Sequence, residues 1–433
     1  MKNKDKIIDI SKNFFILFLL ISAVFLMFKA VIYEPNSAFM NLIGNYGKKS
    51  ESKPMVTIGS TSSVVAAEPV FILVTTKDGS HYAAKYDSQN KDELFSQFSA
   101  ALGEALGSSS APKEISVQQW QNALGESGVF FDYLYPQPLS SIAKWLGTDI
   151  SANASSATAR RLYLGNNNGS LMLYYINEDN GIIYSCETAS SFSTLIYKID
   201  NYSMGSAEFA FEMEDEYKNL DPYFIFSGEN ENLRSVGVLT PLLDDSTVEK
   251  LLSIFEINRR NALQYPNDDG SVVYVEGGKS LRIGASGKIL FSVTGKSGIH
   301  IPYSSEEITV EDSISACSQI VKNSIGLFSG SGKLGLTSIK SNSYPTFTTI
   351  NYGYYIGGIP VTLPNGSFAA SFQISGDTIT RAEFYFRDYN YTSDTSYALP
   401  EKQAIAIVKA AGGEPVLTYE DKGDKVICTW INN

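Results

Sequence analysis

A long apolar run near the N-terminus constrains this chain more than any other feature. Phe14–Phe28 reads FFILFLLISAVFLMF, with Ser22 as its only polar residue, and after Lys29 the apolar character continues to Tyr33. A helix over residues 14–33 is about 30 Å long, which matches the thickness of the hydrocarbon core of a bilayer. The sequence therefore predicts a transmembrane helix at 14–33.

The charges before this run indicate its orientation. Residues 1–13 hold four lysines and two aspartates, a local charge of +2. The positive-inside rule then places 1–13 in the cytoplasm as a short tail and the bulk of the chain outside the cell membrane. The alternative is a cleaved signal peptide, in which a small-residue cleavage site follows a shorter apolar core. Because the nearest such pattern, Val65-Ala66-Ala67, lies far downstream, we expect a permanent single-pass anchor.

The composition of the remaining chain indicates a folded, acidic and β-rich body. Aromatic residues make up 12% of the chain and charged residues only 18%, the opposite of a disordered composition. The net charge is −12, and because residues 1–13 are positive, the rest carries −14. Nucleic-acid binding depends on lysine and arginine against phosphate, so this acidity argues against nucleic acid as a partner.

The length and the spacing of polar segments indicate several domains. At 433 residues the chain is too long for one ordinary core. We expect an α+β fold in which a multidomain extracytoplasmic region of antiparallel sheets with packed helices follows the transmembrane helix. The predicted parts are a linker at 34–68, an N-terminal α/β domain at 69–150, a central β-rich domain at 151–305 and a C-terminal α+β domain at 306–433.

Apolar periodicity and turn residues predict the individual elements. Strands are expected at 70–76, 82–86, 130–135, 161–164, 170–176, 181–186, 272–275, 280–283, 288–293, 347–361, 368–386 and 426–431. Helices are expected at 92–106, 117–124, 139–146, 246–257, 310–325 and 401–411. The strands between 272 and 293 should form an antiparallel meander. Thr309 and Asp312 form a capping box that begins the helix at 310.

The sequence offers little chemistry for catalysis. His81 and His300 are its two histidines, and we expect both at the surface. Neither the G-x-S-x-G pattern of a serine hydrolase nor the H-E-x-x-H pattern of a metalloprotease occurs. Ser329–Lys333 lacks the spacing of a phosphate-binding loop, and Glu212–Glu216 lacks the central glycine of a calcium loop, so both are expected to be ordinary loops. We therefore predict no catalytic, cofactor-binding or metal-binding residues, although paired carboxylates of a glycosidase type stay open.

The three cysteines form no recognisable motif. Cys186, Cys317 and Cys428 are far apart, and no CxxC or Cys/His cluster occurs. Cys317 and Cys428 fall among apolar residues of predicted elements and are expected to be core residues. A single disulfide between two of the three stays open at this point.

Several stretches together resemble the YycH family of Gram-positive bacterial regulators. They are Phe130–Leu146 (FFDYLYPQPLSSIAKWL), Ser271–Val293 (SVVYVEGGKSLRIGASGKILFSV) and Thr309–Phe386, which contains Tyr352–Val361 (YGYYIGGIPV). The last stretch is similar to the C-terminal domain shared by YycH and YycI, which resembles PepSY-type modules. A lysine-rich end, one transmembrane helix and a three-part outer region complete the likeness.

The resemblance implies a non-enzymatic accessory protein without cofactors. Such proteins associate with the membrane sensor histidine kinase of the WalK/WalR (YycG/YycF) two-component system, which controls cell-wall metabolism, and with YycI. They do so partly through transmembrane helices. In this chain the partner-binding residues would then be Phe14, Phe18, Ser22, Ala23 and Phe25, where the small pair Ser22-Ala23 permits close helix approach. Two alternatives stay open: an extracytoplasmic scaffold that binds cell-wall polymer or peptide on strand edges, and a carboxylate-based wall hydrolase.

Overall fold

The computed structural model describes residues 64–432, with gaps at 66–67, 87, 154–156, 214–216, 218, 228–232, 296, 304, 344–345 and 409–412. The predicted cytoplasmic tail, the transmembrane helix at 14–33 and most of the linker lie outside the described residues. Within the described ranges, no helix is long and apolar enough to cross a bilayer.

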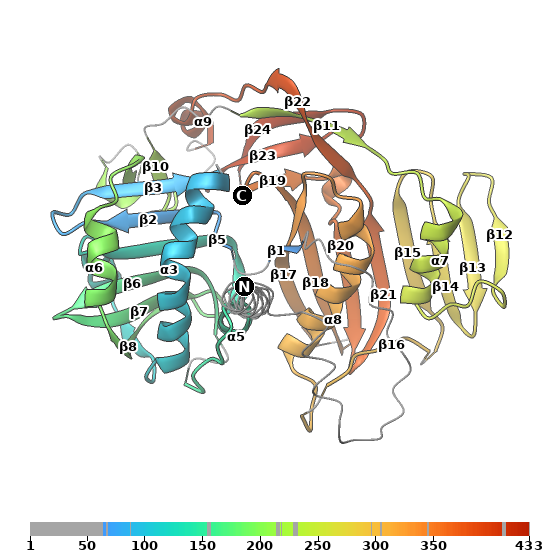
Figure 1. Ribbon diagram of the computed structural model, residues 1–433, viewed down its shortest axis with the longest axis horizontal. Helices are drawn as coiled ribbons and strands as arrows, with labels where there is room; N and C mark the ends of the chain where they lie inside the picture. Colours follow the sequence, from blue (N-terminus) through green and yellow to red (C-terminus); the bar gives the residue numbers. More distant parts are fainter. Residues whose placement is uncertain are drawn as a thin grey trace, which may run out of the picture. The chain divides into compact units, whose positions relative to one another are not determined.

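The first half of the described chain forms a nine-stranded sheet, in the order β10-β9-β3-β2-β5-β6-β7-β8-β4 (Figure 1). Its strands are β2 (Phe71–Thr75), β3 (His81–Lys85), β4 (Lys113–Ile115), β5 (Gly128–Pro138), β6 (Thr158–Asn167), β7 (Ser170–Asn177), β8 (Ile182–Ser191), β9 (Ser206–Phe209) and β10 (Ile225–Ser227). Each neighbouring pair in this sheet is antiparallel.

Helices cover both faces of this sheet, which explains why its central strand is apolar at successive positions. α3 (Ser88–Ser108), α5 (Leu139–Trp145) and α6 (Ser193–Asp200) bury one face, against Val129 and Phe131 of β5. α4 (Val117–Leu124) buries the other face through Trp120, which packs with Phe130. Side chains of a strand alternate between faces, so a strand covered on both sides needs apolar residues throughout.

The second half forms a thirteen-stranded sheet in which β12-β13-β14-β15-β21-β20-β18-β19-β23-β24 is the main path. Its strands are β1 (Val64–Val65), β12 (Leu263–Pro266), β13 (Val272–Glu276), β14 (Lys279–Ile283), β15 (Lys288–Val293), β16 (Ile299–His300), β17 (Lys333–Ser343), β18 (Thr346–Ile356), β19 (Ile359–Thr362), β20 (Ala370–Ser375), β21 (Thr378–Tyr385), β23 (Pro415–Asp421) and β24 (Val426–Asn432). The pairs β13–β14 and β14–β15 confirm the predicted meander. β1 pairs in parallel with β17.

Two helices pack on this sheet, and a third lies beside its β23–β24 end (Figure 1). They are α7 (Asp245–Ile254), α8 (Val310–Asn323) and α9 (Glu401–Val408). The predicted capping box begins α8: the Thr309 hydroxyl accepts from the Asp312 N–H at 3.1 Å, and the Asp312 carboxylate accepts from the Thr309 N–H at 3.0 Å. A separate two-stranded sheet joins β11 (Arg234–Leu239) to β22 (Asp388–Thr395).

Several local predictions need correction, among them the helix predicted at 246–257, which ends at Ile254. β5 does not end at Pro136 but continues to Pro138, with an irregular register after Asp132. The strands predicted at 347–361 and 368–386 are each divided in two by a turn, and the helix predicted to reach residue 325 ends at Asn323. Strands β17, β22 and β23 were not predicted, because their sequences mix polar and apolar residues without clear alternation.

Strand pairing continues across the positions where the sequence indicates domain boundaries. β5 pairs with β6 across residue 150, and β15 pairs with β21 across residue 305. The division into three domains stays a prediction, whereas the sheets are established by their hydrogen bonds.

Candidate functional site

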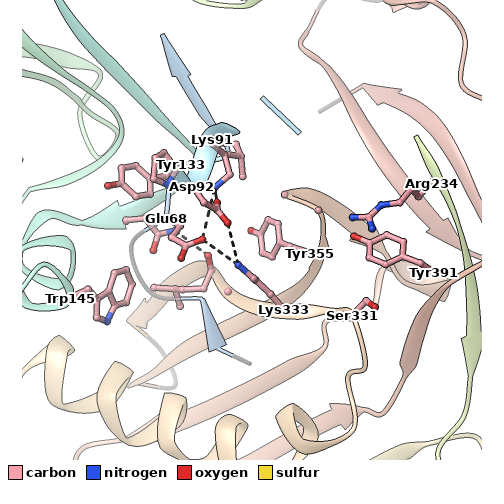
Figure 2. Close-up of a pocket in the computed structure, with 17 residues that line it drawn as sticks. Glu68, Lys91, Asp92, Tyr133, Trp145, Arg234, Ser331, Lys333, Tyr355 and Tyr391 are labelled. Atoms are coloured by element: carbon pink, nitrogen blue, oxygen red, sulfur yellow. Dashed lines mark hydrogen bonds and ion pairs between the residues drawn. The ribbon is translucent and has the colours of Figure 1, made fainter. Parts of the chain in front are cut away.

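The described residues enclose a cavity of about 290 Å³ where elements of the two large sheets meet (Figure 2). This volume lies near the lower end of the range for small-molecule sites, roughly 300–1,000 Å³. The start of α3, the segment before β2, and strand β5 contribute from one side. Strands β17, β18, β11 and β22 contribute from the other. Residues about 300 positions apart thus share one small space.

Two lysines and two carboxylates form an ion-pair quartet at one end of the cavity. Lys91 Nζ lies 2.7 Å from Asp92 Oδ1 and 3.9 Å from Glu68 Oε2. Lys333 Nζ lies 3.6 Å from the same Glu68 oxygen and 3.9 Å from Asp92 Oδ2. Lys91 is buried, whereas about half of the Lys333 side chain is exposed. The quartet is neutral as a whole and joins the first turn of α3 to the first residue of β17.

A single arginine stacked on a tyrosine stands apart from this quartet in Figure 2. The guanidinium carbon of Arg234 lies 3.5 Å from the centroid of the Tyr391 ring. The two residues belong to the paired strands β11 and β22, in which Arg234 lies opposite Thr395 and Tyr391 lies opposite Val236, with a register shift between the two pairs. No carboxylate of the described chain lies within ion-pair distance of Arg234. Stacking holds a flat cation in place while leaving its N–H groups available.

Two polar groups of cavity-lining residues are buried without a hydrogen-bond partner in the described part of the chain. They are Gln137 Oε1 and the hydroxyl of Tyr133. Gln137 Nε2 is satisfied, because it donates to Leu336 O at 3.0 Å and to Tyr135 O at 3.2 Å. Burial, reinforced by the nearby Glu68 carboxylate, raises the pKa of Tyr133 far above its usual value, so this phenol is neutral. Buried polar atoms normally have hydrogen-bond partners, so these two atoms can accept a partner supplied by water or by a ligand.

Glycines line the cavity where side chains would fill it. Gly357 and Gly358 form the β18–β19 turn with φ values of 58° and 83°, a left-handed conformation that favours glycine. At Gly335 of β17, a Cβ atom would lie 2.9 Å from the Tyr355 ring. These residues belong to the Tyr352–Val361 stretch and to β17, so the glycine-rich turn of the sequence forms part of the cavity wall.

A buried ion network joins the two sheets elsewhere. Arg160 donates to both oxygens of Asp132, at 2.7 and 2.8 Å, and to Glu414 Oε1 at 2.7 Å. Arg161 lies 3.4 Å from Asp132 and 3.0 Å from Asp221. Burial opposes the charged form of Asp132, but the two arginines outweigh it and hold its pKa below the usual value. Its carboxylate is saturated with donors, which indicates a structural role.

The prediction that His81 lies at the surface is wrong. His81 is 8% exposed, its Nδ1 lies 3.0 Å from Thr75 Oγ1, and its Nε2 lies 2.9 Å from Glu212 Oε1. The reason is tertiary: β9 pairs with β3 at this residue and covers the imidazole with Phe209. His300 is exposed, as predicted.

The other residues considered from the sequence lie in different places. Cys186, Cys317 and Cys428 are buried, and no disulfide joins any two of them in the described structure. Ser331 and Lys333 of the loop Ser329–Lys333 line the cavity. Among the described residues, no group of three or more histidine, cysteine or acidic side chains is arranged to hold a metal ion. The predicted partner-binding residues Phe14, Phe18, Ser22, Ala23 and Phe25 lie outside the described residues.

Sequence reasoning did not identify the cavity. Arg234, Tyr391, Gln137 and Tyr133 come from three strands that are distant in the chain. Tyr133 and Gln137 lie in the quoted stretch Phe130–Leu146, but nothing in that stretch indicated a binding role. The sequence feature that could have pointed to the cavity is the pair of glycine-rich segments 329–333 and 357–358. Residues of both segments line the cavity, but they come together only in the folded chain.

The fold is of the α+β class, built on large antiparallel sheets with packed helices. No family model and no curated protein matches the sequence. The chain is similar in structure to YycH from Bacillus subtilis, whose crystal structure aligns with a TM-score of 0.53. The alignment covers 86% of this chain and 97% of that chain at 10% sequence identity. At this identity the likeness concerns the fold alone.

Proposed function

We propose that this protein is a non-enzymatic, membrane-anchored regulator of a sensor histidine kinase that controls cell-wall metabolism. The observation that carries the proposal is the YycH-like fold over 86% of the chain. The family resemblance of the sequence points the same way, toward a kinase of the WalK/YycG type and a YycI-like protein as partners. In this proposal the chain is a single-pass protein of the cell membrane with its bulk outside the cytoplasm.

Such regulation needs only a difference in binding between two states of the kinase. A coupling free energy of about 1–3 kcal/mol shifts an equilibrium roughly 5- to 150-fold. Helix packing in the membrane supplies part of this energy, and contacts of the outer region supply the rest. Phe14, Phe18, Ser22, Ala23 and Phe25 are the residues proposed to contact the partner helix, where small residues allow close packing.

The test is co-purification of the kinase with the full-length protein from membranes. We expect the kinase to be retained by the native chain and lost when Phe14–Phe28 is replaced by an unrelated apolar span of equal length. Ala23→Leu should weaken retention because a larger side chain separates the helices. Leu19→Ile, which keeps size and hydrophobicity, is the matched control and should retain the kinase.

Two results would contradict the proposal. The first is recovery of the mature polypeptide in the culture medium, trimmed after residue 28, because a cleaved chain has no anchor. The second is release of soluble products from purified peptidoglycan by the native protein, abolished by a single Asp or Glu substitution, since this would establish a hydrolase.

A further inference from the structure

We propose that the cavity between α3, β17 and β22 binds a small molecule that carries one carboxylate and an N–H donor, the chemistry of an N-acylated amino acid or of a peptide C-terminus. This inference does not depend on the proposed kinase partner. It rests on the charges, the unpaired polar atoms and the walls of the cavity.

The charge of the cavity favours a single negative group. The quartet of Lys91, Lys333, Glu68 and Asp92 is neutral, so Arg234 leaves the lining with an excess of one positive charge. A dianion such as a phosphate monoester would exceed this single positive charge and leave the occupied site with a net charge of −1. A carboxylate matches both the excess charge and the planar fork of the guanidinium.

Arg234 is already oriented for this contact. Its guanidinium stacks on Tyr391 at 3.5 Å and points into the cavity in Figure 2. A side chain that is held before binding loses less rotational entropy when the ligand arrives. The stacking therefore increases the affinity of the site for a carboxylate.

The requirement for an N–H donor on the ligand comes from a second polar residue of the lining. Gln137 lines the cavity, its Nε2 is engaged with Leu336 O, and its Oε1 has no partner in the described structure. An amide oxygen without a partner costs free energy when buried, and a ligand N–H removes that cost. An N-acylated amino acid or a peptide C-terminus carries both a carboxylate and an amide N–H, the two groups that Arg234 and Gln137 call for.

The walls between these polar groups are aromatic. Tyr355, Tyr133 and Trp145 line the cavity beside Gly335 and the glycine turn at 357–358. Aromatic walls with a few polar groups are typical of small-molecule sites, and they suit an apolar side chain on the ligand.

The experiment is isothermal titration calorimetry of the full-length protein in detergent micelles. The probes are the N-acetyl derivatives of alanine, leucine, phenylalanine and tyrosine, the corresponding N-acetyl amides, a hexapeptide with a free C-terminus, and phenyl phosphate. We expect at least one N-acetyl amino acid to bind and its amide to bind about 10-fold or more weakly, since the amide cannot form the charged contact.

Two variants in the cavity and one control variant outside it test whether the ligand binds in this cavity. Arg234→Gln should weaken binding of the acid about 10-fold or more and leave the amide unchanged. Ser331→Phe should abolish binding by filling the cavity. Arg260→Gln, at an exposed arginine outside the cavity, should bind as the native protein does. Circular dichroism of each variant establishes that it is folded.

The outcomes distinguish the two possible kinds of ligand and define the results that would overturn the inference. Tighter binding of the hexapeptide identifies a peptide C-terminus as the ligand, and tighter binding of the N-acetyl amino acids identifies a free small molecule. The inference is overturned if no carboxylate binds, if acid and amide bind equally, if folded Arg234→Gln binds normally, or if phenyl phosphate binds more tightly than every carboxylate.

Discussion

Arg160 and Glu414 lie 254 residues apart in the sequence and form a buried ion pair, with Nη2 2.7 Å from Oε1. Both side chains are 10% exposed. The pair joins β6 of the nine-stranded sheet to the residue that precedes β23 of the thirteen-stranded sheet. It thus holds together the two sheets that enclose the cavity.

Removing one partner of this pair should destabilise the protein strongly. We expect Glu414→Ala to lower the free energy of unfolding by about 3–5 kcal/mol, because Arg160 stays buried with fewer acceptors. Urea unfolding of the full-length protein measures this change. Glu383→Ala is the matched control: Glu383 pairs with Arg381 at the surface, and its loss should cost about 1 kcal/mol or less. Equal losses for both variants would show that the buried pair has no special role.

The same network predicts a dependence of stability on acid pH. The pKa of Asp132 is lower in the folded protein than its usual value because the attraction of Arg160 and Arg161 outweighs burial. The unfolded chain, with an aspartate pKa of about 3.9, therefore binds more protons between the two values. This contribution to stability is complete above about pH 4 and is lost as the pH falls through the folded pKa.

Urea unfolding at a series of pH values between about 6 and 2 tests this dependence. Asp132→Asn should flatten the decrease of the unfolding free energy at acid pH, since an amide does not titrate there. Asp424→Asn, at an exposed position, should leave the decrease unchanged. A native decrease in the Asp132→Asn protein would be inconsistent with the network as its source.

The capping box of α8 should contribute measurably to stability. Thr309→Ala removes the hydroxyl that accepts from the Asp312 N–H at 3.1 Å, and we expect it to lower the unfolding free energy by about 1 kcal/mol. Thr309→Ser keeps the hydroxyl and should stay within a few tenths of a kcal/mol of the native value. Thermal or urea unfolding distinguishes the two. A loss equal in both variants would assign the effect to the lost methyl group instead.

The three thiols should be unreactive in the folded protein. Cys186, Cys317 and Cys428 are buried, and burial raises the pKa of Cys186 to about 11. Because the thiolate is the reactive form, iodoacetamide at pH 8 should modify none of them in the native state. After unfolding in urea, mass spectrometry should find all three modified. Rapid modification of a native thiol would show that its surroundings open to solvent.

Local sequence signals predicted many of the elements correctly. The capping box at Thr309 and the apolar spacing of 92–106 and 117–124 led to helices that the structure contains. The same reasoning failed where neighbours in space decide. His81 was placed at the surface because β9, which pairs with β3 at this residue, is distant in the chain and was not predicted.

By itself, the sequence determined the identity of most helices, the meander between 272 and 293 and the apolar character of β5, because these depend on interactions within a few residues. Only the tertiary structure decided the pairing of β15 with β21 and the contact of Arg160 with Glu414. It also decided that Arg234 and Gln137 line the same cavity. Each of these joins segments far apart in the chain. Their pairing follows from which arrangement of sheets buries the most apolar surface and satisfies the buried polar groups, and no local pattern records that choice.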